Sequence, residues 1–371
     1  MKRRLGLGVG AATVVWLISG SLSNGLLGNE LLAPPDAGKY AVTDPAQVDD
    51  DYAYQGEYAG SVCDPQCGWI WTGLQVIARG DGRFEAVQYR GGLPGAGWDR
   101  QTKRMLAGQL SEGLLVLNAE DGWSVVADGR TASVSSSDGR LRGSLTKRHR
   151  ASPTLGAAPP RNALVLFDGT SADQFQGGKV TEDGLLDVGG VTKMPVRDFR
   201  LHLEFRLPYM PYATGQGRSN SGVYIQQRYE VQILDSFGLE GVANECGGLY
   251  RQQAPDVNMC LPPLVWQTYD IWFTAARFDD EGNKIANARL TLLHNGVAIH
   301  NRREIPAKTG AGKPEGSEWL PILLQNHSNP VRFRNIWIVL EPEAEKAAPC
   351  RTPTRCQPLR RLLRRLPCGR R

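Results

Sequence analysis

The 371-residue sequence contains few histidines and few methionines, five of each. It shows no helical periodicity of domain length, which argues against a helical bundle. Charges of both signs are interspersed along the body of the chain. The sequence therefore shows no basic patch of the kind that binds nucleic acid, and we expect no nucleic-acid partner. With 41% hydrophobic and 22% charged residues, the composition is that of a soluble globular protein large enough for two domains.

An apolar run occurs only at the start and is short. Lys2, Arg3 and Arg4 precede apolar residues from Leu5 to about Ile18. This pattern is typical of a secretory signal peptide, which we place at residues 1–24, and it predicts export to the periplasm or the extracellular space. An uncleaved anchor is the alternative, although the run is shorter than the ~20 residues that span a bilayer.

The seven cysteines suit an oxidising compartment. Cys63 and Cys67 are close enough to close a loop, and Cys246 with Cys260 could close another, although spacing alone fixes neither pairing. The two cysteines of CDPQC have no second Cys/His pair at the spacing of a zinc finger, so a zinc site is disfavoured there.

The net charge of +5 belongs to the C-terminal tail, residues 342–371, because nine basic and no acidic residues follow from Lys346 onward. In PLRRLLRRLP, four leucines have the spacing of one helical face and four arginines fill the remainder. The alternatives are disorder and a short helix that binds an anionic membrane or wall surface.

A first β-rich region is expected at residues 51–147, after a linker at 25–50. Asp81-Gly82 and Asp121-Gly122 are hairpin signals between alternating apolar runs, so we expect a small antiparallel β domain. This region has no histidine before His149 and shows no catalytic constellation. A packing or spacer role is therefore the simpler interpretation.

A second β-rich region is expected at residues 163–341, after a Pro/Ala/Ser linker at 148–162. In DFRLHLEFRL, apolar residues alternate with His202, Glu204 and Arg206, and Asn295-Gly296 marks a hairpin. Many short strands separated by turn signals favour a two-sheet sandwich of jelly-roll type. The predicted fold class is therefore all-β, with the smaller β domain in front of the sandwich.

The stretch YEVQILD raises the question of function. Tyr229, Val231 and Ile233 fall on one face of a strand, and Glu230 and Gln232 fall on the other. The first face is core. The second meets either water, as in many antiparallel sheets, or a ligand.

Six ordered motifs resemble the 3-keto-disaccharide hydrolase domain family, whose fold is a concanavalin-like or laminin-G-like jelly roll. They are LVLFDGT, NSGVYIQQRYEVQILDS, GGLYRQQAPDVNM, VWQTYDI, LLHNGVAI and LLQNHSNPVRFRNIWI. The resemblance covers roughly residues 163 to 340. Gln226 and Gln227 depart from it, since the family often has an arginine-containing turn in that region.

The resemblance implies a saccharide substrate with a ketone at C3, which acidifies the hydrogen on C2. A base can remove that hydrogen, and the enolate can expel the glycosidic oxygen from C1 before water adds. Glu230 is the candidate base or metal ligand, His327 the acid/base partner, and Asp235 the group that orients either one. No cofactor is certain, but these three residues could hold a divalent ion.

Sugar binding requires amides, carboxylates, guanidinium groups and aromatic faces. Arg334 could instead form an internal ion pair with Glu204 or Glu230, and we interpret His202 and His294 as structural. The alternative functions are a non-catalytic carbohydrate-binding or adhesion module and a cell-surface structural protein. The candidate substrate-binding residues are Asn220, Gln232, Tyr250, Trp266, Gln325 and Arg334.

Overall fold

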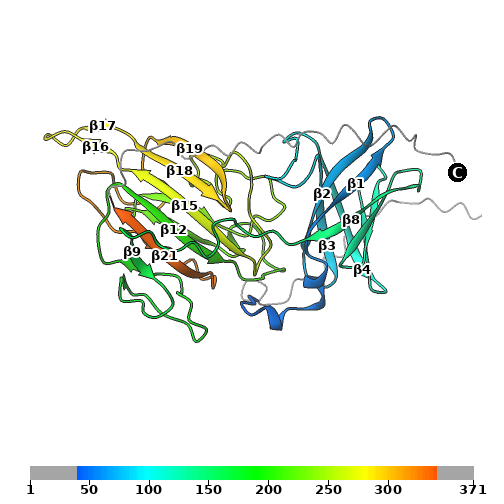
Figure 1. Ribbon diagram of the computed structural model, residues 1–371, viewed down its shortest axis with the longest axis horizontal. Coiled ribbons are helices and arrows are strands. Elements are labelled where there is room, and N and C mark those ends of the chain that lie inside the picture. Colours follow the sequence, from blue (N-terminus) through cyan, green and yellow to red (C-terminus); the bar gives the residue numbers. More distant parts are fainter. Residues whose placement is uncertain (1–39, 341–371) are drawn as a thin grey trace, which may run out of the picture. The chain divides into compact units, whose positions relative to one another are not determined.

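The computed structural model describes residues 40–340, and their regular secondary structure is almost entirely antiparallel β-strand (Figure 1). The described residues contain no α-helix, only the short 3₁₀ helices η1 (Pro45–Gln47), η2 (Asp50–Ala53) and η3 (Gly215–Gly217). Within this range no helix is long and apolar enough to cross a membrane. The all-β prediction is confirmed, whereas the expected signal peptide and basic tail lie outside the described residues.

The first eight strands form a closed barrel in which each strand pairs with the next and β8 pairs with β1. Closure leaves no unpaired sheet edge. Alternate side chains fill the interior with an apolar core that includes Tyr58, Leu74 and Leu117. The strands are β1 (Gly56–Asp64), β2 (Gly68–Ala78), β3 (Arg83–Arg90), β4 (Lys103–Ser111), β5 (Leu114–Asn118), β6 (Ser124–Ala127), β7 (Thr131–Ser135) and β8 (Leu141–Arg148).

The expected turn residues connect these strands. Asp81 and Gly82, with φ of 55° and 70°, lie between β2 and β3. Asp121 and Gly122 lie between β5 and β6, and the φ of Gly122 is 83°. Positive φ is accessible to glycine without steric cost and is tolerated by aspartate, which is why these dipeptides mark hairpins.

The later strands form two facing sheets. A five-stranded sheet has the order β10-β11-β20-β13-β14, a six-stranded sheet has the order β19-β18-β15-β12-β21-β9, and β16 pairs with β17 in a separate hairpin. The strands are β9 (Leu164–Phe167), β10 (Phe175–Gln176), β11 (Val191–Thr192), β12 (Phe199–Arg206), β13 (Ser221–Ile225), β14 (Tyr229–Ile233), β15 (Trp266–Thr274), β16 (Arg277–Phe278), β17 (Lys284–Ala286), β18 (Ala288–His294), β19 (Val297–Ile305), β20 (Leu323–Leu324) and β21 (Arg332–Leu340).

The core of the sandwich lies between the two sheets. On β12 the alternate residues Phe199, Leu201, Leu203 and Phe205 all face this core, as their alternation predicted. Tyr229, Val231 and Ile233 of β14 contribute from the opposite sheet. Each sheet therefore has one outer face where the intervening polar residues lie.

Neither of the two cysteine pairings that the sequence left open, Cys63 with Cys67 and Cys246 with Cys260, forms. Cys67 is a free, exposed thiol, so it is not bonded to Cys63. Cys246 and Cys260 are also free, and both are buried. The sulfur of Cys246 lies 3.2 Å from the hydroxyl of Tyr269, so this thiol packs in the core as a small residue with a weak hydrogen bond.

Candidate active site

Glu230 projects from the outer face of the five-stranded sheet and is almost fully buried. Its side chain comes from β14, directly opposite Tyr224 of β13. The Tyr224 hydroxyl donates a hydrogen bond of 2.7 Å to Oε2 of Glu230. Only 2% of Glu230 is exposed, so the outer face here is covered by other segments and does not meet bulk water.

Two loops fix the backbone of Glu230. Its N–H donates to Oγ1 of Thr309 at 2.7 Å, and its carbonyl oxygen accepts from the N–H of Tyr250 at 3.1 Å. Tyr224 and Thr309 were not among the expected site residues. The register of the hairpin contained a signal for Tyr224, because the tight connection at Gln226 and Gln227 places position 224 opposite position 230.

The position of this carboxyl controls its ionisation. Burial raises the pKa of Glu230 to about 7, and the hydrogen bond from Tyr224 offsets part of that increase. Near neutral pH the group therefore exists in both protonation states. A carboxyl with this property can both accept and return a proton.

Gly222 makes room for the Glu230 side chain. A Cβ atom at this position would lie 2.8 Å from Oε1 of Glu230 and 3.3 Å from Oε1 of Gln325. Gly310 has a similar role, since a Cβ there would lie 2.9 Å from the Tyr250 ring and 3.6 Å from Oε2 of Glu230. The structure thus brings together three of the expected residues: Glu230, Tyr250 and Gln325.

Gln325 has an unused acceptor at this point. Its backbone N–H donates to the carbonyl oxygen of Gly222 at 2.8 Å, which fixes it beside β13. Its side-chain Oε1 is buried and has no hydrogen-bond partner among the described residues. A buried acceptor without a donor is costly unless a ligand or water supplies one.

A second amide group lies along the same strand face. Gln232 donates from Nε2 to Oε1 of Gln216 at 3.0 Å, and Asn220 donates from Nδ2 to the backbone oxygen of Gln216 at 2.8 Å. Oε1 of Gln232 is buried and has no partner within the described range. The expected residues Asn220 and Gln232 are therefore joined by Gln216, which no sequence signal identified.

Asp235 does not take the role expected from the sequence. Nε of Arg218 donates to its carboxylate at 2.6 Å, and both side chains are buried, so this carboxylate is committed to an ion pair. Among residues 40–340, no group of three or more His, Cys, Asp or Glu side chains is placed to hold a metal ion. The expectation that Glu230, Asp235 and His327 form a metal site is therefore wrong for the described chain.

His327 lies two positions beyond Gln325, in the exposed segment that follows β20. It is the one member of the expected catalytic set that solvent reaches freely. Its role as an acid or base stays a prediction.

Trp266 and Arg334 belong to a different surface, the outer face of the six-stranded sheet. Arg334 donates from Nε to Oε2 of Glu204 at 2.7 Å and lies 4.0 Å over the Trp266 ring. The ion pair with Glu204, which the sequence left open, is therefore present. The core separates this face from Glu230, so the expectation that these two residues share its site is wrong.

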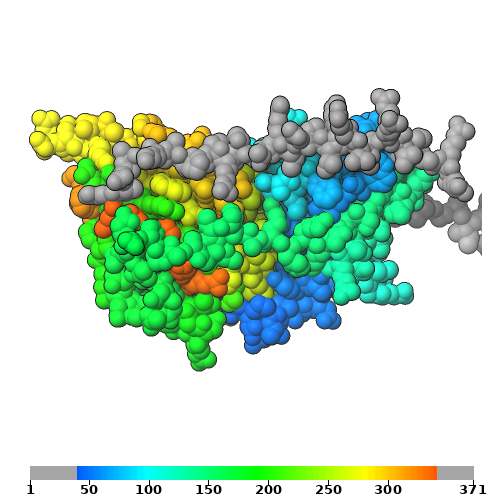
Figure 2. Space-filling view, viewed as in Figure 1, coloured from blue at the N-terminus to red at the C-terminus, as the bar shows by residue number. Residues whose placement is uncertain are grey.

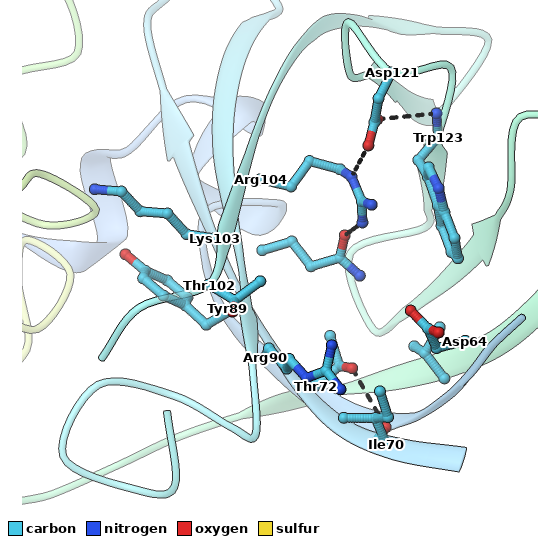
Figure 3. Close-up of a pocket in the computed structure, with 12 residues that line it drawn as sticks. Asp64, Ile70, Thr72, Tyr89, Arg90, Thr102, Lys103, Arg104, Asp121 and Trp123 are labelled. Carbon is cyan, nitrogen blue, oxygen red and sulfur yellow. Dashed lines mark hydrogen bonds and ion pairs between the residues drawn. The ribbon is translucent and has the colours of Figure 1, made fainter. Parts of the chain in front are cut away.

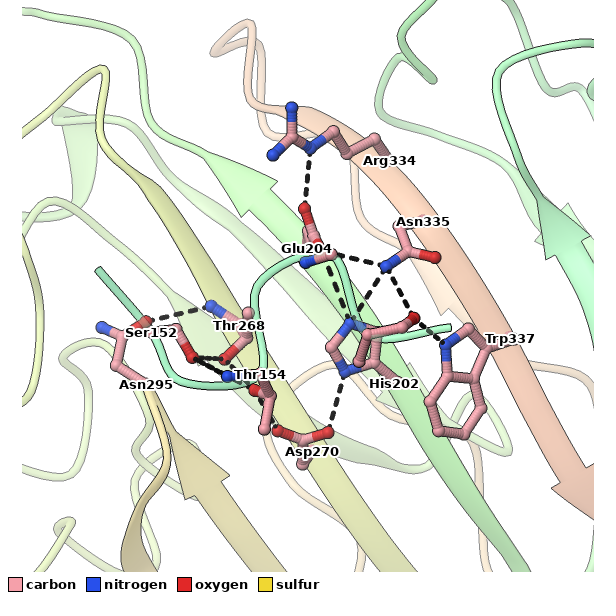
Figure 4. Close-up of polar contacts among 12 residues, drawn as sticks. Ser152, Thr154, His202, Glu204, Thr268, Asp270, Asn295, Arg334, Asn335 and Trp337 are labelled. Atoms are coloured by element: carbon pink, nitrogen blue, oxygen red, sulfur yellow. Dashed lines mark hydrogen bonds and ion pairs between the residues drawn. The ribbon is translucent and has the colours of Figure 1, made fainter. Parts of the chain in front are cut away.

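The linker after β8 covers part of the same outer face, as the green segment in the space-filling view shows (Figure 2). Thr154 donates to Oδ2 of Asp270 at 2.7 Å, and the backbone N–H of Gly156 donates to Oε1 of Glu204 at 2.5 Å. His202 lies between these two carboxylates, 2.8 Å from Asp270 (Figure 4). The network therefore attaches the linker to the sheet.

The charges in this network stabilise one another. Burial disfavours a charged His202, but Asp270 and Glu204 outweigh it and raise the pKa of His202 above 6.5. Burial also disfavours the charged form of Glu204, but hydrogen bonds lower the pKa of Glu204 to about 2. The largest of these lowering contributions comes from His202. His202 thus has the structural role that the sequence suggested.

The fold and the site define an antiparallel β-sandwich protein that carries a titratable buried carboxyl and a set of amides on one outer face. Residues 162–339 match the family model of the 3-keto-alpha-glucoside-1,2-lyase-like domain, so this part of the chain belongs to that family. The family membership makes the chain a carbohydrate-active protein.

Solved structures of three candidate glycosyl hydrolases from Parabacteroides distasonis are also similar. The first shares 35% identity, with 48% of this chain and 84% of that chain covered and a TM-score of 0.44. The second shares 17% identity over 49% and 94% of the two chains, with a TM-score of 0.36. The third shares 21% over 47% and 98%, with a TM-score of 0.33. A search of curated proteins finds no match.

Proposed function

We propose that this protein is an enzyme that cleaves glycosides bearing a ketone at C3, with Glu230 as the group that transfers the proton. The observation that carries the proposal is the Glu230 carboxyl itself, whose pKa burial raises to about 7. Family membership supports a sugar substrate, and a base whose pKa lies near the working pH transfers protons efficiently.

The reaction would proceed by elimination and hydration. The carboxylate of Glu230 takes the C2 proton, and the electron pair of the C2–H bond passes to the C3 ketone as an enolate. The enolate then forms the C1–C2 double bond and expels the glycosidic oxygen, which leaves with its electron pair and takes a proton. Water adds its hydroxyl to C1 and a proton to C2, which completes a net hydrolysis.

The neighbouring groups fit the binding part of this scheme. Oε1 of Gln232 and Oε1 of Gln325 are unpaired buried acceptors, and sugar hydroxyls are donors that could satisfy them. His327, exposed beyond Gln325, is the candidate for protonating the departing oxygen.

The ketone of the substrate, and not the raised pKa of Glu230, distinguishes this route from that of an ordinary glycosidase, whose general acid is also a carboxyl with a raised pKa. Two-carboxylate hydrolysis uses a pair of acids separated by about 5–9.5 Å. The pKa of Glu230 is shifted by burial and by Tyr224, and no second carboxylate within the described residues contributes to that shift.

The decisive experiment uses a 3-keto-disaccharide and its unoxidised parent. We expect release of monosaccharide from the ketone substrate alone. Glu230→Gln should reduce turnover about 10²–10⁴-fold, the usual loss when a general base is removed. Glu245→Gln is the matched control, because burial also raises the pKa of this carboxyl but its partners are the N–H groups of Gly241 and Val242.

Turnover of Glu230→Gln within about twofold of the wild type would remove Glu230 from the mechanism. Cleavage of both substrates at the same rate would argue against elimination. Saturable binding of the ketone substrate without any release of monosaccharide would instead identify a non-catalytic binding module.

A further inference from the structure

The inside of the barrel changes from apolar to polar toward one of its ends. Leu74 on β2, Ala86 on β3 and Leu106 on β4 face the apolar interior. Two residues further along each strand, toward the same end, the inward positions are occupied by Thr72, Gln88 and Arg104. Side chains on a strand alternate between faces, so these polar groups point into the mouth of the barrel.

This mouth holds a cavity of about 200 Å³ (Figure 3). Eight-stranded barrels are just wide enough to hold one small ligand, and the mouths of barrels are common ligand sites. The lining includes Asp64, Thr72, Gln88, Arg90, Arg104 and Trp123.

Arg104 is held in a fixed position at the centre of the lining. Nη1 donates to Oε1 of Gln88 at 2.8 Å, and Nε donates to Asp121 at 2.8 Å. The guanidinium group also lies 4.5 Å from the centre of the Trp123 ring. Figure 3 shows Arg104, Asp121 and Trp123 around the same space. Such a set is pre-organised, so little side-chain entropy is lost when a ligand binds.

The charges of the lining balance one another. Asp64 and Asp121 face Arg90 and Arg104, and the ammonium group of Lys103 is bonded to Glu240. An anionic ligand would meet two carboxylates here, and a cationic ligand would meet two guanidinium groups. The lining therefore favours a neutral ligand that both donates and accepts hydrogen bonds.

We propose that the mouth of the barrel binds one neutral sugar ring. Carboxylate, amide, guanidinium and hydroxyl groups supply paired donors and acceptors for sugar hydroxyls, and the indole of Trp123 supplies a flat apolar surface. The barrel lies outside residues 162–339, so this site is separate from Glu230 and its binding does not depend on the proposed reaction. It gives the barrel a carbohydrate-binding role in place of the spacer role expected from the sequence.

The test is calorimetric titration of the full chain with D-glucose, D-galactose and D-mannose, and separately with D-glucuronate and inorganic phosphate. We expect saturable binding of at least one neutral hexose. Gln88→Glu keeps the acceptor for Arg104 but removes the amide donors, and Trp123→Leu removes the aromatic surface. Each should weaken binding about tenfold, the effect of losing one good contact.

Trp69→Leu is the matched control, since Trp69 lies on β2 but is 56% exposed on the outside of the barrel. It should leave the affinity unchanged. Thermal melting identifies any variant that fails to fold, and Gln88→Glu decides the outcome if Trp123→Leu is unstable. Turnover of a 3-keto-disaccharide should stay within about twofold in Gln88→Glu, which separates this test from that of Glu230.

Three results would overturn the proposal. They are the absence of saturable binding by any of the three hexoses, binding by glucuronate or phosphate alone, and hexose binding that Gln88→Glu leaves unchanged. The last result would place the hexose at another site.

Discussion

The carboxyl of Glu230 lies over Gly222, a strand position that has no side chain. Gly222→Ala would place a Cβ atom 2.8 Å from Oε1, so the carboxyl would have to move. Misplacement of a catalytic group by about 1 Å costs about 10²-fold in rate, and we expect a loss of that order in steady-state turnover.

The control for this substitution is Gly217→Ala. A Cβ atom on Gly217 would meet no heavy atom within 4 Å, and its φ is not positive. Turnover of Gly217→Ala should match the wild type. If Gly222→Ala also retained full turnover, the position of the Glu230 carboxyl would not matter to the reaction.

The pH dependence of the reaction is also set at the residue scale. The carboxylate form of Glu230 is the base, so kcat/KM should rise with pH through about 7. The hydrogen bond from Tyr224 lowers the pKa of Glu230, so Tyr224→Phe should raise that pKa and move the rise to higher pH. The measurement is a pH profile of kcat/KM on a 3-keto-disaccharide.

Tyr229→Phe provides the comparison, because the Tyr229 hydroxyl donates to Glu315 and not to Glu230. Its pH profile should coincide with that of the wild type. An unchanged profile in Tyr224→Phe would contradict the assignment of the profile to Glu230.

At the scale of elements, strands β12 and β15 use buried charges to attach the linker that follows the barrel. The pKa of His202 is raised above 6.5 in the folded state, so its charged form stabilises the fold below pH 6.5. That contribution is lost as pH rises through the folded-state pKa. Glu204, whose pKa is lowered to about 2, contributes above pH 4.5 and loses this contribution as the pH falls toward 2.

We therefore expect His202→Gln to remove part of the pH dependence of stability. The difference in free energy of unfolding between wild type and His202→Gln should shrink as the pH rises above 6.5, since the wild type then loses its imidazolium. Chemical denaturation at a series of pH values measures this difference. A difference that grows with increasing pH would show that His202 is not stabilised as a cation.

At the scale of the whole molecule, the chain combines a sugar-active sandwich, a barrel with a polar mouth and, outside the described residues, a basic tail. We propose that the tail tethers an exported protein, because Leu359, Leu362, Leu363 and Leu366 have the spacing of one helical face. The full chain should then bind anionic vesicles, and added salt should weaken this binding.

Truncation after Ala348 should abolish vesicle binding and leave turnover of a 3-keto-disaccharide unchanged. Sedimentation with vesicles of defined anionic lipid content measures the binding. Equal binding by the truncated and the full-length protein would show that the tail is not the tether.

Several features of the fold could be predicted from the sequence because their causes are local. The alternation of Leu201 with His202 indicates a strand whose apolar face packs in the core, and Asn295 with Gly296 adopts the positive φ values that a tight hairpin needs. The ordered motifs identified the family of residues 162–339. Glu230, Tyr250 and Gln325 were among the expected residues that the structure brings together.

Only the tertiary structure decided which outer face each polar residue occupies. Alternation with period two looks the same in both sheets, so it could not separate Trp266 and Arg334 on one outer face from Glu230 on the other. It also could not show that loops bury Glu230 and raise its pKa, or that Arg218 neutralises Asp235. Burial and pairing depend on segments distant in sequence, and their contacts form only when the sheets and loops pack.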